Sequence, residues 1–442
     1  MTESKQSSHV KPSPSLKSSI KRIFASKFNV DVFWNLGSLA VLGVAGVLTN
    51  SVIAAYGGAQ ALGVFHQVGA IYIVLSQLSV GAMHLSVLHR VSQSQNDRTT
   101  CADLTVSALI LCLVSSVGVC AVAFALRHVA GDALKSDGVS IGLGFAAPGL
   151  IFFSLNKVLM SVLNGVRSMR IYAVFQSLRF VFVLLAIVVI VGIARPAVEL
   201  ALALTFSELA LFLLLVVYVN GRVFPLRLTH GVRAWHRKHF AFGMRGFPSG
   251  LLSEINLRVD VLMLGYFSGD AIVGVYSFAA LLAAGLSQIP LAVRRNVDPI
   301  LGQRFAEEMH ESIHVMATKI RKAMFILMGG LALVAAGMYP FLLGVFVDPF
   351  AFAGSGVVFS ILLVGIVLNS GYRPFLGVLL QGGRPGAHTW LILVTVGVNV
   401  GLNAALIPVL GFLGAAIATS VVYVCEAVGL VILARRLLGV RL

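Results

Sequence analysis

Residues 171–194 read IYAVFQSLRFVFVLLAIVVIVGIA, an apolar run that holds a single charge, Arg179. About 20 apolar residues in a helix span the hydrocarbon core of a bilayer, so this run predicts a transmembrane helix. Eleven other runs of similar length predict the same, which makes the chain an all-α integral membrane protein with twelve transmembrane helices. The predicted spans cover residues 32–56, 64–89, 103–127, 139–164, 171–194, 198–220, 241–266, 271–295, 321–347, 355–380, 388–410 and 412–434.

The composition supports a membrane protein and excludes a soluble enzyme. Hydrophobic residues make up 58% of the chain and charged residues 11%, with a mean hydropathy of +0.94. The net charge of +16 would suggest nucleic acid as the partner of a soluble protein. Here the basic residues lie in loops that face anionic headgroups, so we expect membrane lipids as partners and no nucleic acid. We expect neither a metal nor another cofactor, because no CxxC spacing links Cys101, Cys112, Cys120 and Cys425.

The loop charges predict the topology. Lys and Arg gather in the two tails and in every second gap between spans, whereas the other gaps contain only Arg127, Lys135 and Arg195. Basic loops are retained in the cytoplasm, so both termini are predicted to be cytoplasmic. Residues 1–30 are rich in Ser, Pro and Lys and are predicted to form a disordered basic tail without a cleavable signal peptide.

The two halves of the chain resemble one another. The tripeptide Leu-Ser-Gln occurs at residues 75–77 and 286–288, with the same offset as Gly63 and Gly274 in the preceding turns. Each half has an even number of spans and starts in the cytoplasm, so the repeats are parallel and related by a pseudo-two-fold axis along the membrane normal. The predicted parts are a first six-helix lobe, a cytoplasmic linker and a second six-helix lobe, at residues 31–220, 221–240 and 241–442.

A family resemblance rests on residues 253–276, which read SEINLRVDVLMLGYFSGDAIVGVY. This segment resembles the seventh–eighth helix hairpin of polysaccharide transporters in the multidrug/oligosaccharidyl-lipid/polysaccharide (MOP) flippase superfamily. The Gly-Arg pairs at Gly165/Arg167 and Gly382/Arg384 and the sequence GFLGAAIAT at 411–419 are similar as well. The resemblance extends from about residue 30 to the end of the chain, and it implies the fold shared with the multidrug and toxin extruders (MATE).

The resemblance implies an alternating-access flippase rather than an enzyme. Such a protein moves polyprenyl-diphosphate-linked oligosaccharide from the cytoplasmic to the periplasmic leaflet, for assembly of O-antigen, capsule or exopolysaccharide. The expected location is the bacterial inner membrane, and the lipid-linked oligosaccharide is the expected substrate. No catalytic residue is implied. The sequence leaves undecided whether a glycan polymerase or a chain-length regulator binds the loops.

Charged residues within predicted spans are the candidate site, because an ion at the bilayer centre costs roughly 2.5–3.5 kcal/mol or more. Lys157, Arg179 and Arg373 lie about 10–12 Å from the predicted cytoplasmic ends of their helices. They either reach headgroups or structural partners, or line a cationic cavity that binds a diphosphate. Their presence in both lobes favours the cavity. Pro374 is expected to bend the helix beside Arg373.

The predicted seventh span carries the most charge. Glu254 and Arg258 are four residues apart, so they either form an ion pair on one helical face or act separately. In the second case Arg258 contacts the diphosphate, and Glu254 or Asp260 takes a coupling proton or cation. Arg245 is expected to be an interfacial anchor.

Further polar residues lie inside other spans. Glu208 and Glu426, in the sixth helix of each half, are either packing residues or sites for a coupling ion. The uncharged side chains are expected mostly to form hydrogen bonds between helices, with sugar contact as the alternative. These residues are Asn35, Asn50, Gln77, Asn156, Gln176, Gln288, Asn369, Asn399 and Asn403.

Two other functions are weighed against the flippase. A cation-coupled multidrug antiporter of the same superfamily would need unpaired carboxylates to hold cationic drugs. A membrane glycosyltransferase or glycan polymerase would need a sizeable periplasmic loop, and the longest one predicted, residues 128–138, is too short. Because one fold serves several functions, the sign of the charges in the cavity separates the first two.

Overall fold

The computed structural model describes residues 27–227 and 231–442. Nearly all of the predicted tail lies outside these residues, and so do the side chains of Asn35 and Arg245. Every assigned element in the two described ranges is a helix and none is a strand, which confirms the all-α class.

The elements divide into a first and a second half, and the predicted linker 221–240 is itself partly helical, since one element ends at Val223 and the next begins at Val232. The first half contains α2 (Lys27–Val80), α3 (Met83–Gln93), α4 (Arg98–Ala125), α5 (Arg127–Leu134), α6 (Asp137–Ala146), α7 (Gly149–Gly165), α8 (Met169–Gly192), η1 (Ala197–Ala201), α9 (Leu202–Tyr218) and η2 (Val219–Val223). The second half contains α10 (Val232–Asn256), α11 (Val259–Ser268), α12 (Asp270–Ala306), α13 (His310–Phe346), α14 (Ser355–Ser370), η3 (Arg373–Phe375), α15 (Val378–Gln381), α16 (Pro385–Leu410) and α17 (Phe412–Leu438).

Eight helices among the described residues are long and apolar enough to cross a membrane, or up to ten if two bent pairs count as one span each. The bent pairs are α6 with α7, at 49°, and α14 with η3 and α15, at 52°. The twelve predicted transmembrane spans differ from these helices at two places. The element α2 holds two predicted spans joined at Gly58, whose φ of 67° lies in the left-handed region that suits glycine. The seventh predicted span is divided between α10 and α11 and is more polar.

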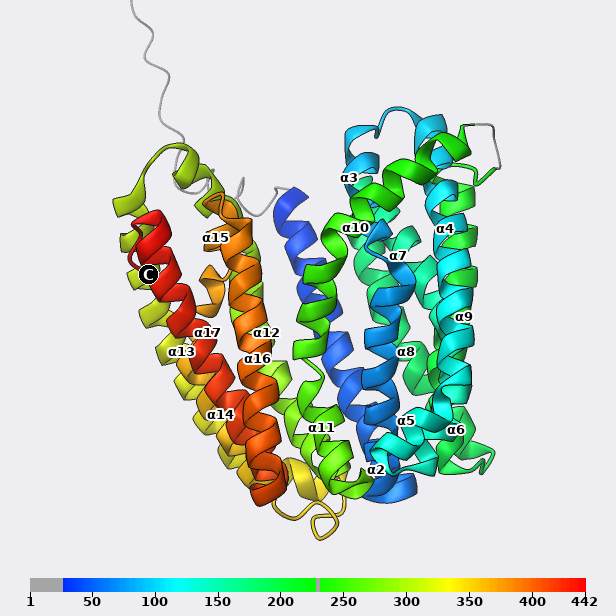
Figure 1. Cartoon of the computed structure of the whole chain (residues 1–442), viewed down its shortest axis with the longest axis vertical. Helices are drawn as coiled ribbons and strands as arrows, with labels where there is room; N and C mark the ends of the chain where they lie inside the picture. Colours follow the sequence, from blue (N-terminus) through cyan, green and yellow to red (C-terminus); the bar gives the residue numbers. More distant parts are fainter. Residues whose placement is uncertain (1–26, 228–230) are drawn as a thin grey trace, which may run out of the picture.

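Figure 1 shows how the halves are arranged. The helices α12–α17 lie together at the left, α4–α9 lie at the right, and α10 and α11 run between them. The two halves meet mainly where α2 packs along α12. The start of α2 and the C-terminus lie toward the same end of the molecule in this view. This is the relation that an even number of crossings produces.

Large apolar side chains cover the outer surface as well as the core. Val217, Leu333 and Val409 are each more than 70% exposed, although they lie in apolar helices. A helix that is apolar all round needs an apolar environment on every side, and only neighbouring helices or lipid provide it. The fold is therefore that of a multi-pass membrane protein.

Two glycines bring the halves into backbone contact where α2 resumes after its kink at Gly58 and where α12 begins. A Cβ added at Gly63 would overlap the carbonyl oxygen of Asp270, and one added at Gly274 would overlap the carbonyl oxygen of Ala59. The carboxylate of Asp270 also accepts hydrogen bonds from the first half, from Gln67 Nε2 at 2.7 Å and Ser136 Oγ at 2.7 Å. Small residues permit this approach, and the polar contacts then hold the two helices together.

We predict that Gly63→Ala and Gly274→Ala each destabilise the protein, because the added methyl group meets backbone that cannot move aside. Overpacking of this kind costs about 1–3 kcal/mol. Thermal unfolding of the purified protein in detergent measures the loss. The controls are Gly69→Ala and Gly285→Ala on the same helices, where a Cβ meets nothing within 4 Å. Equal melting temperatures for the two pairs of variants would show that the contact is not tight.

Candidate substrate site

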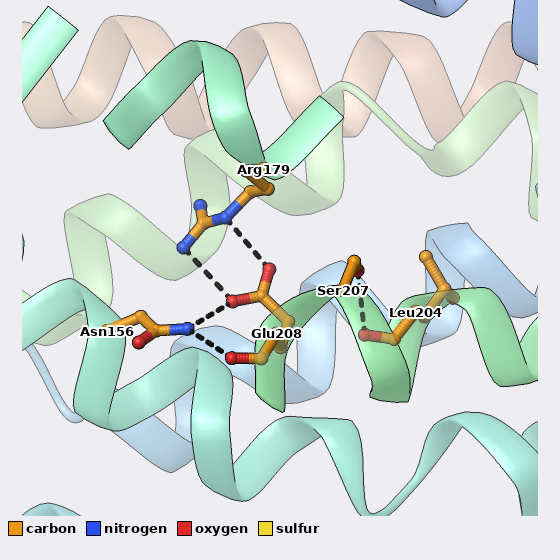
Figure 2. A network of polar contacts seen from close by, with 5 residues as sticks. All are labelled: Asn156, Arg179, Leu204, Ser207 and Glu208. Carbon is orange, nitrogen blue, oxygen red and sulfur yellow. Dashed lines mark hydrogen bonds and ion pairs between the residues drawn. The ribbon is translucent and has the colours of Figure 1, made fainter. Parts of the chain in front are cut away.

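A buried polar cluster joins α7, α8 and α9, as Figure 2 shows. Arg179 Nε lies 2.8 Å from Glu208 Oε1, and Arg179 Nη2 donates to Glu208 Oε2 at 3.3 Å. Asn156 Nδ2 donates to both Oε2 and the backbone carbonyl of Glu208, each at 2.8 Å. The Glu208 side chain is only 5% exposed, against 23% for Arg179. Glu208 thus has the partners that a buried carboxylate requires.

This cluster bears on two predictions. Glu208 links α7 and α8 to α9, as the packing alternative of the two considered for it requires. Arg179 remains a predicted diphosphate ligand, but its guanidinium already neutralises Glu208 and lies 4.7 Å from the centre of the Phe153 ring. A phosphate would therefore meet Arg179 as part of a neutral pair.

Lys157 follows Asn156 on α7 and has weaker partners. Its Nζ donates to Gln77 Oε1 at 3.4 Å and lies 5.4 Å from the centre of the Phe153 ring. Within the described part of the chain, no carboxylate comes within ion-pair distance of it. Two carboxylates, Glu254 on α10 and Glu208 on α9, act on it electrostatically from farther away, and the Arg179 cation opposes them. Lys157 is thus a cation without an ion-pair partner among the described residues.

The predicted seventh span is broken within its charged segment. The helix α10 ends at Asn256, and Arg258 has a non-helical φ of −124° before α11 begins. Glu254 and Arg258 therefore do not share one helical face, and the described residues contain no ion pair between them. Asn399 Nδ2 donates to both the backbone carbonyl and Oδ1 of Asn256 at 3.1 Å, which satisfies the broken end of α10. The Nε of Arg258 is buried without a hydrogen-bond partner among the described residues.

Asp260 lies in the first turn of α11 and is fully hydrogen-bonded. Its Oδ1 accepts from the Val261 backbone N–H at 2.8 Å, and its Oδ2 accepts from the Tyr276 hydroxyl. The Tyr276 oxygen lies 3.5 Å from Thr419 Oγ1 on α17. Three helices thus meet at one carboxylate. It has no ion-pair partner among the residues described.

Arg373 lies at the predicted break in the tenth span. The helix α14 ends at Ser370, and Arg373 and Pro374 begin the short helix η3, which confirms the expected bend. The Arg373 guanidinium lies 5.4 Å from the centre of the Tyr423 ring. Its Nε is buried and lacks a hydrogen-bond acceptor in the described structure.

A matching contact lies close by in the second half. Asn369 Nδ2 on α14 donates to Glu426 Oε2 on α17 at 2.8 Å. This repeats the Asn156–Glu208 bond between the fourth and sixth predicted helices of the first half. Glu426 differs from Glu208 because the described residues give it no ion-pair partner.

The sequence missed some members of these clusters. Tyr276 places its hydroxyl group beside Asp260, Tyr423 places its ring beside Arg373, and Asn256 links the end of α10 to α16. The two tyrosines could have been found in the sequence, because a polar aromatic side chain inside an apolar span is unusual. The hydrogen bonds expected between helices are confirmed for Asn156, Asn369 and Asn399. In the part of the chain that the structure describes, no three His, Cys, Asp or Glu side chains are grouped as a metal ion would need.

We predict that Arg179→Ala and Glu208→Ala each lower stability by about 3 kcal/mol, because each leaves a buried charge without its partner. The double variant should lose less than the sum of the two, with a coupling of at least about 1 kcal/mol. Thermal unfolding measures this cycle. Arg195 and Glu199, an exposed pair at 2.8 Å, provide the matched control with a coupling below about 1 kcal/mol. Additive effects at Arg179 and Glu208 would contradict the pairing.

Solved structures share this fold at low sequence identity. An inward-facing multidrug resistance MATE family transporter of the MOP superfamily matches with a TM-score of 0.78 and 13% identity, over 92% of this chain and 98% of that one. The lipid II flippase MurJ, in an inward closed conformation, matches with a TM-score of 0.73 and 12% identity, over 92% of this chain and 87% of that one. An outward-facing MATE family transporter matches with a TM-score of 0.61 and 17% identity, over 91% of this chain and 96% of that one. No curated protein matches the chain.

The family of this chain is identified by a match of its amino-acid sequence. The profile of the family described as polysaccharide biosynthesis protein matches residues 93–346, which is more than half of the chain. The match covers α4–α13 almost completely and so includes the broken seventh span. The chain therefore belongs to the polysaccharide biosynthesis protein family, and its fold is similar to that of the MATE and MurJ structures.

Proposed function

We propose that this protein is an alternating-access flippase for polyprenyl-diphosphate-linked oligosaccharide in the bacterial inner membrane. It carries the substrate from the cytoplasmic to the periplasmic leaflet for surface polysaccharide assembly. Membership of the polysaccharide biosynthesis family supports the pathway, and the fold shared with a lipid II flippase supports lipid-linked cargo. A glycan polymerase and a chain-length regulator are its proposed partners.

The observation that carries this proposal is a set of in-span cations without carboxylate partners. Among the described residues, Lys157, Arg258 and Arg373 form no ion pair. A diphosphate that leaves water needs fixed cations and donors, and guanidinium groups suit it because they form two parallel hydrogen bonds. Buried unpaired cations are costly in an empty protein, so a site that keeps them is suited to an anionic ligand.

The proposed cycle rocks two six-helix lobes, residues 31–220 and 241–442, about the 221–240 linker. Both termini are proposed to face the cytoplasm. The contact between Gly63 and Gly274 then closes the periplasmic side in this conformation. The higher TM-score to the inward-facing than to the outward-facing MATE structure supports an inward-facing state.

Asp260 is the proposed coupling carboxylate. Of the predicted acids, Glu208 is committed to Arg179 and Asn156. Asp260 instead relies on neutral donors at the junction of α11, α12 and α17, where a proton or cation can replace them without breaking an ion pair. Glu254 and Glu426 remain the other candidates.

A cation-coupled multidrug antiporter is the second candidate, because the MATE transporter shares the fold over 92% of this chain. Cationic drugs would be repelled by Lys157, Arg258 and Arg373 and attracted only by Glu254, Asp260 and Glu426. The free cations therefore favour the anionic lipid. A polymerase is not supported, since part of the predicted loop 128–138 belongs to the short helix α5.

We predict that Arg373→Ala abolishes glycan export at normal protein level, and that Lys157→Ala reduces it. Loss of a hydrogen bond to a charged group costs about 1.5–3 kcal/mol, which corresponds to about tenfold or more. Glycan export by Arg373→Lys should also be well below that of the wild type, because lysine lacks the planar guanidinium group that forms two parallel hydrogen bonds. The measurements are surface polysaccharide and the lipid-linked oligosaccharide retained on the cytoplasmic leaflet.

The control for this series is Arg435→Ala, an exposed cation at the end of α17. It should export normally. Normal export by Arg373→Ala would remove this residue from the site. Extrusion of cationic dyes by the wild type, without accumulation of lipid-linked sugar when the gene is deleted, would favour the antiporter instead.

We predict that Asp260→Asn uncouples transport from the ion gradient. In proteoliposomes, an imposed sodium or proton gradient should accelerate wild-type flipping and leave the variant at its basal rate. Glu426→Gln and Glu254→Gln serve as parallel arms. If the gradient still accelerates flipping by Asp260→Asn but not by one of the two glutamine variants, the glutamate replaced in that variant is the coupling residue.

A further inference from the structure

The first turns of α10 are fixed against α3 and α4. His239 is buried, with Nε2 donating to the Leu104 carbonyl at 2.9 Å and Nδ1 accepting from Ser86 Oγ at 3.0 Å. His236 Nδ1 lies 2.6 Å from Ser107 Oγ. Burial lowers the pKa of His239 to about 4, so at neutral pH the ring is uncharged and makes both bonds. These bonds attach the first turns of α10, which belong to the predicted linker, to the first half.

A groove between α3 and α10 lies beside these turns. It has a volume of about 420 Å³ and is lined by Arg90, Ala234, Arg237, Lys238, Ala241 and Phe242. Three of the lining side chains are cations and none is acidic. Within the described residues, none of the three cations forms an ion pair. The α3–α10 groove thus concentrates positive charge.

Aromatic rings hold these cations in place without neutralising them. The Arg90 guanidinium lies 5.2 Å and the Lys238 ammonium 4.0 Å from the centre of the Trp235 ring. His89 stacks on Phe242 with ring centres 5.7 Å apart. Cation–π contacts fix the position of a charge and leave its hydrogen-bond donors available. Tryptophan is also enriched at the level of lipid headgroups.

An apolar slot lies at another face of α10. It has a volume of about 360 Å³, and Phe240, Phe247, Leu78, Leu111 and Val114 are among its lining residues. Phe240 is 61% exposed and directly precedes the groove residue Ala241. A site for phosphate and a site for hydrocarbon therefore occur on the same short stretch of α10.

We propose that the α3–α10 groove binds the phosphate of an anionic phospholipid from the surrounding bilayer, with an acyl chain in the apolar slot. Charge complementarity argues for this occupant, because a zwitterionic headgroup would bring its own cation against Arg90, Arg237 and Lys238. The site is separate from the proposed flippase site and does not depend on it.

The position of the groove gives the lipid a structural effect. The helix α10 packs on α3, α4 and α16. His239, in its first part, bonds to α3 and α4, and Asn256, at its end, bonds to α16 of the second half. A lipid held between α3 and α10 would strengthen the connection between the two halves. Binding should therefore appear as resistance to unfolding of the whole protein.

The test uses the purified full chain in a neutral detergent, with phosphatidylglycerol, phosphatidylcholine, polyprenyl phosphate or inorganic phosphate added. We predict that phosphatidylglycerol alone raises the wild-type melting temperature by several degrees. In the Arg237→Gln/Lys238→Gln variant the rise should fall to less than half. The control variant, Arg435→Gln/Arg436→Gln at exposed positions of α17, should respond as the wild type does.

Three outcomes would overturn the proposal. An equal rise in the groove and control variants would make the effect a general response to anionic lipid. A rise with inorganic phosphate would assign the groove to a free anion, and a rise only with polyprenyl phosphate would assign it to the transported lipid. If the double variant does not fold, Arg237→Gln alone is titrated with phosphatidylglycerol, and an unchanged midpoint would equally refute the site.

Discussion

A charge inside a bilayer has no water to solvate it, and the polar interior of this protein follows from that constraint. Glu208 is satisfied by Arg179 and Asn156 in a closed cluster. Asp260 is satisfied by neutral donors from α11 and α12. Arg258 and Arg373 are left with buried, unpaired nitrogen atoms. The charged residues therefore differ in the partners that they find inside the protein.

Helix breaks accompany the charges that lack partners. Arg258 stands between α10 and α11, and Arg373 between α14 and α15. A helix break leaves backbone groups that need hydrogen-bond partners. At the break after α10, the Asn399 side chain supplies one by donating to the Asn256 carbonyl. Irregular backbone in a membrane is tolerated where it is enclosed by protein or lines a water-filled space. Backbone broken in this way is therefore expected to be enclosed, and not to face lipid.

Much of the fold could be predicted because length and apolarity are local properties. The all-helical class, the bend at Pro374 and the hydrogen bonds of Asn156 and Asn369 between helices all followed from residues read in order. Of the two alternatives for Glu254 and Arg258, the ion pair is not found among the described residues, and the reason is physical. Spacing of four residues predicts a contact only on a continuous helix, and a break at residue 257 moves the two side chains onto different axes.

By itself, the sequence determined that the chain is helical, that it belongs in a membrane, and which charges would be expensive there, since each depends on residue type and local order. Only the tertiary structure decided which of those charges find partners. Arg179 meets Glu208 from 29 residues away, whereas Lys157 and Arg373 meet aromatic rings instead of carboxylates. Pairing of this kind depends on how helices rotate and pack against one another, and packing is set by the whole set of side chains together.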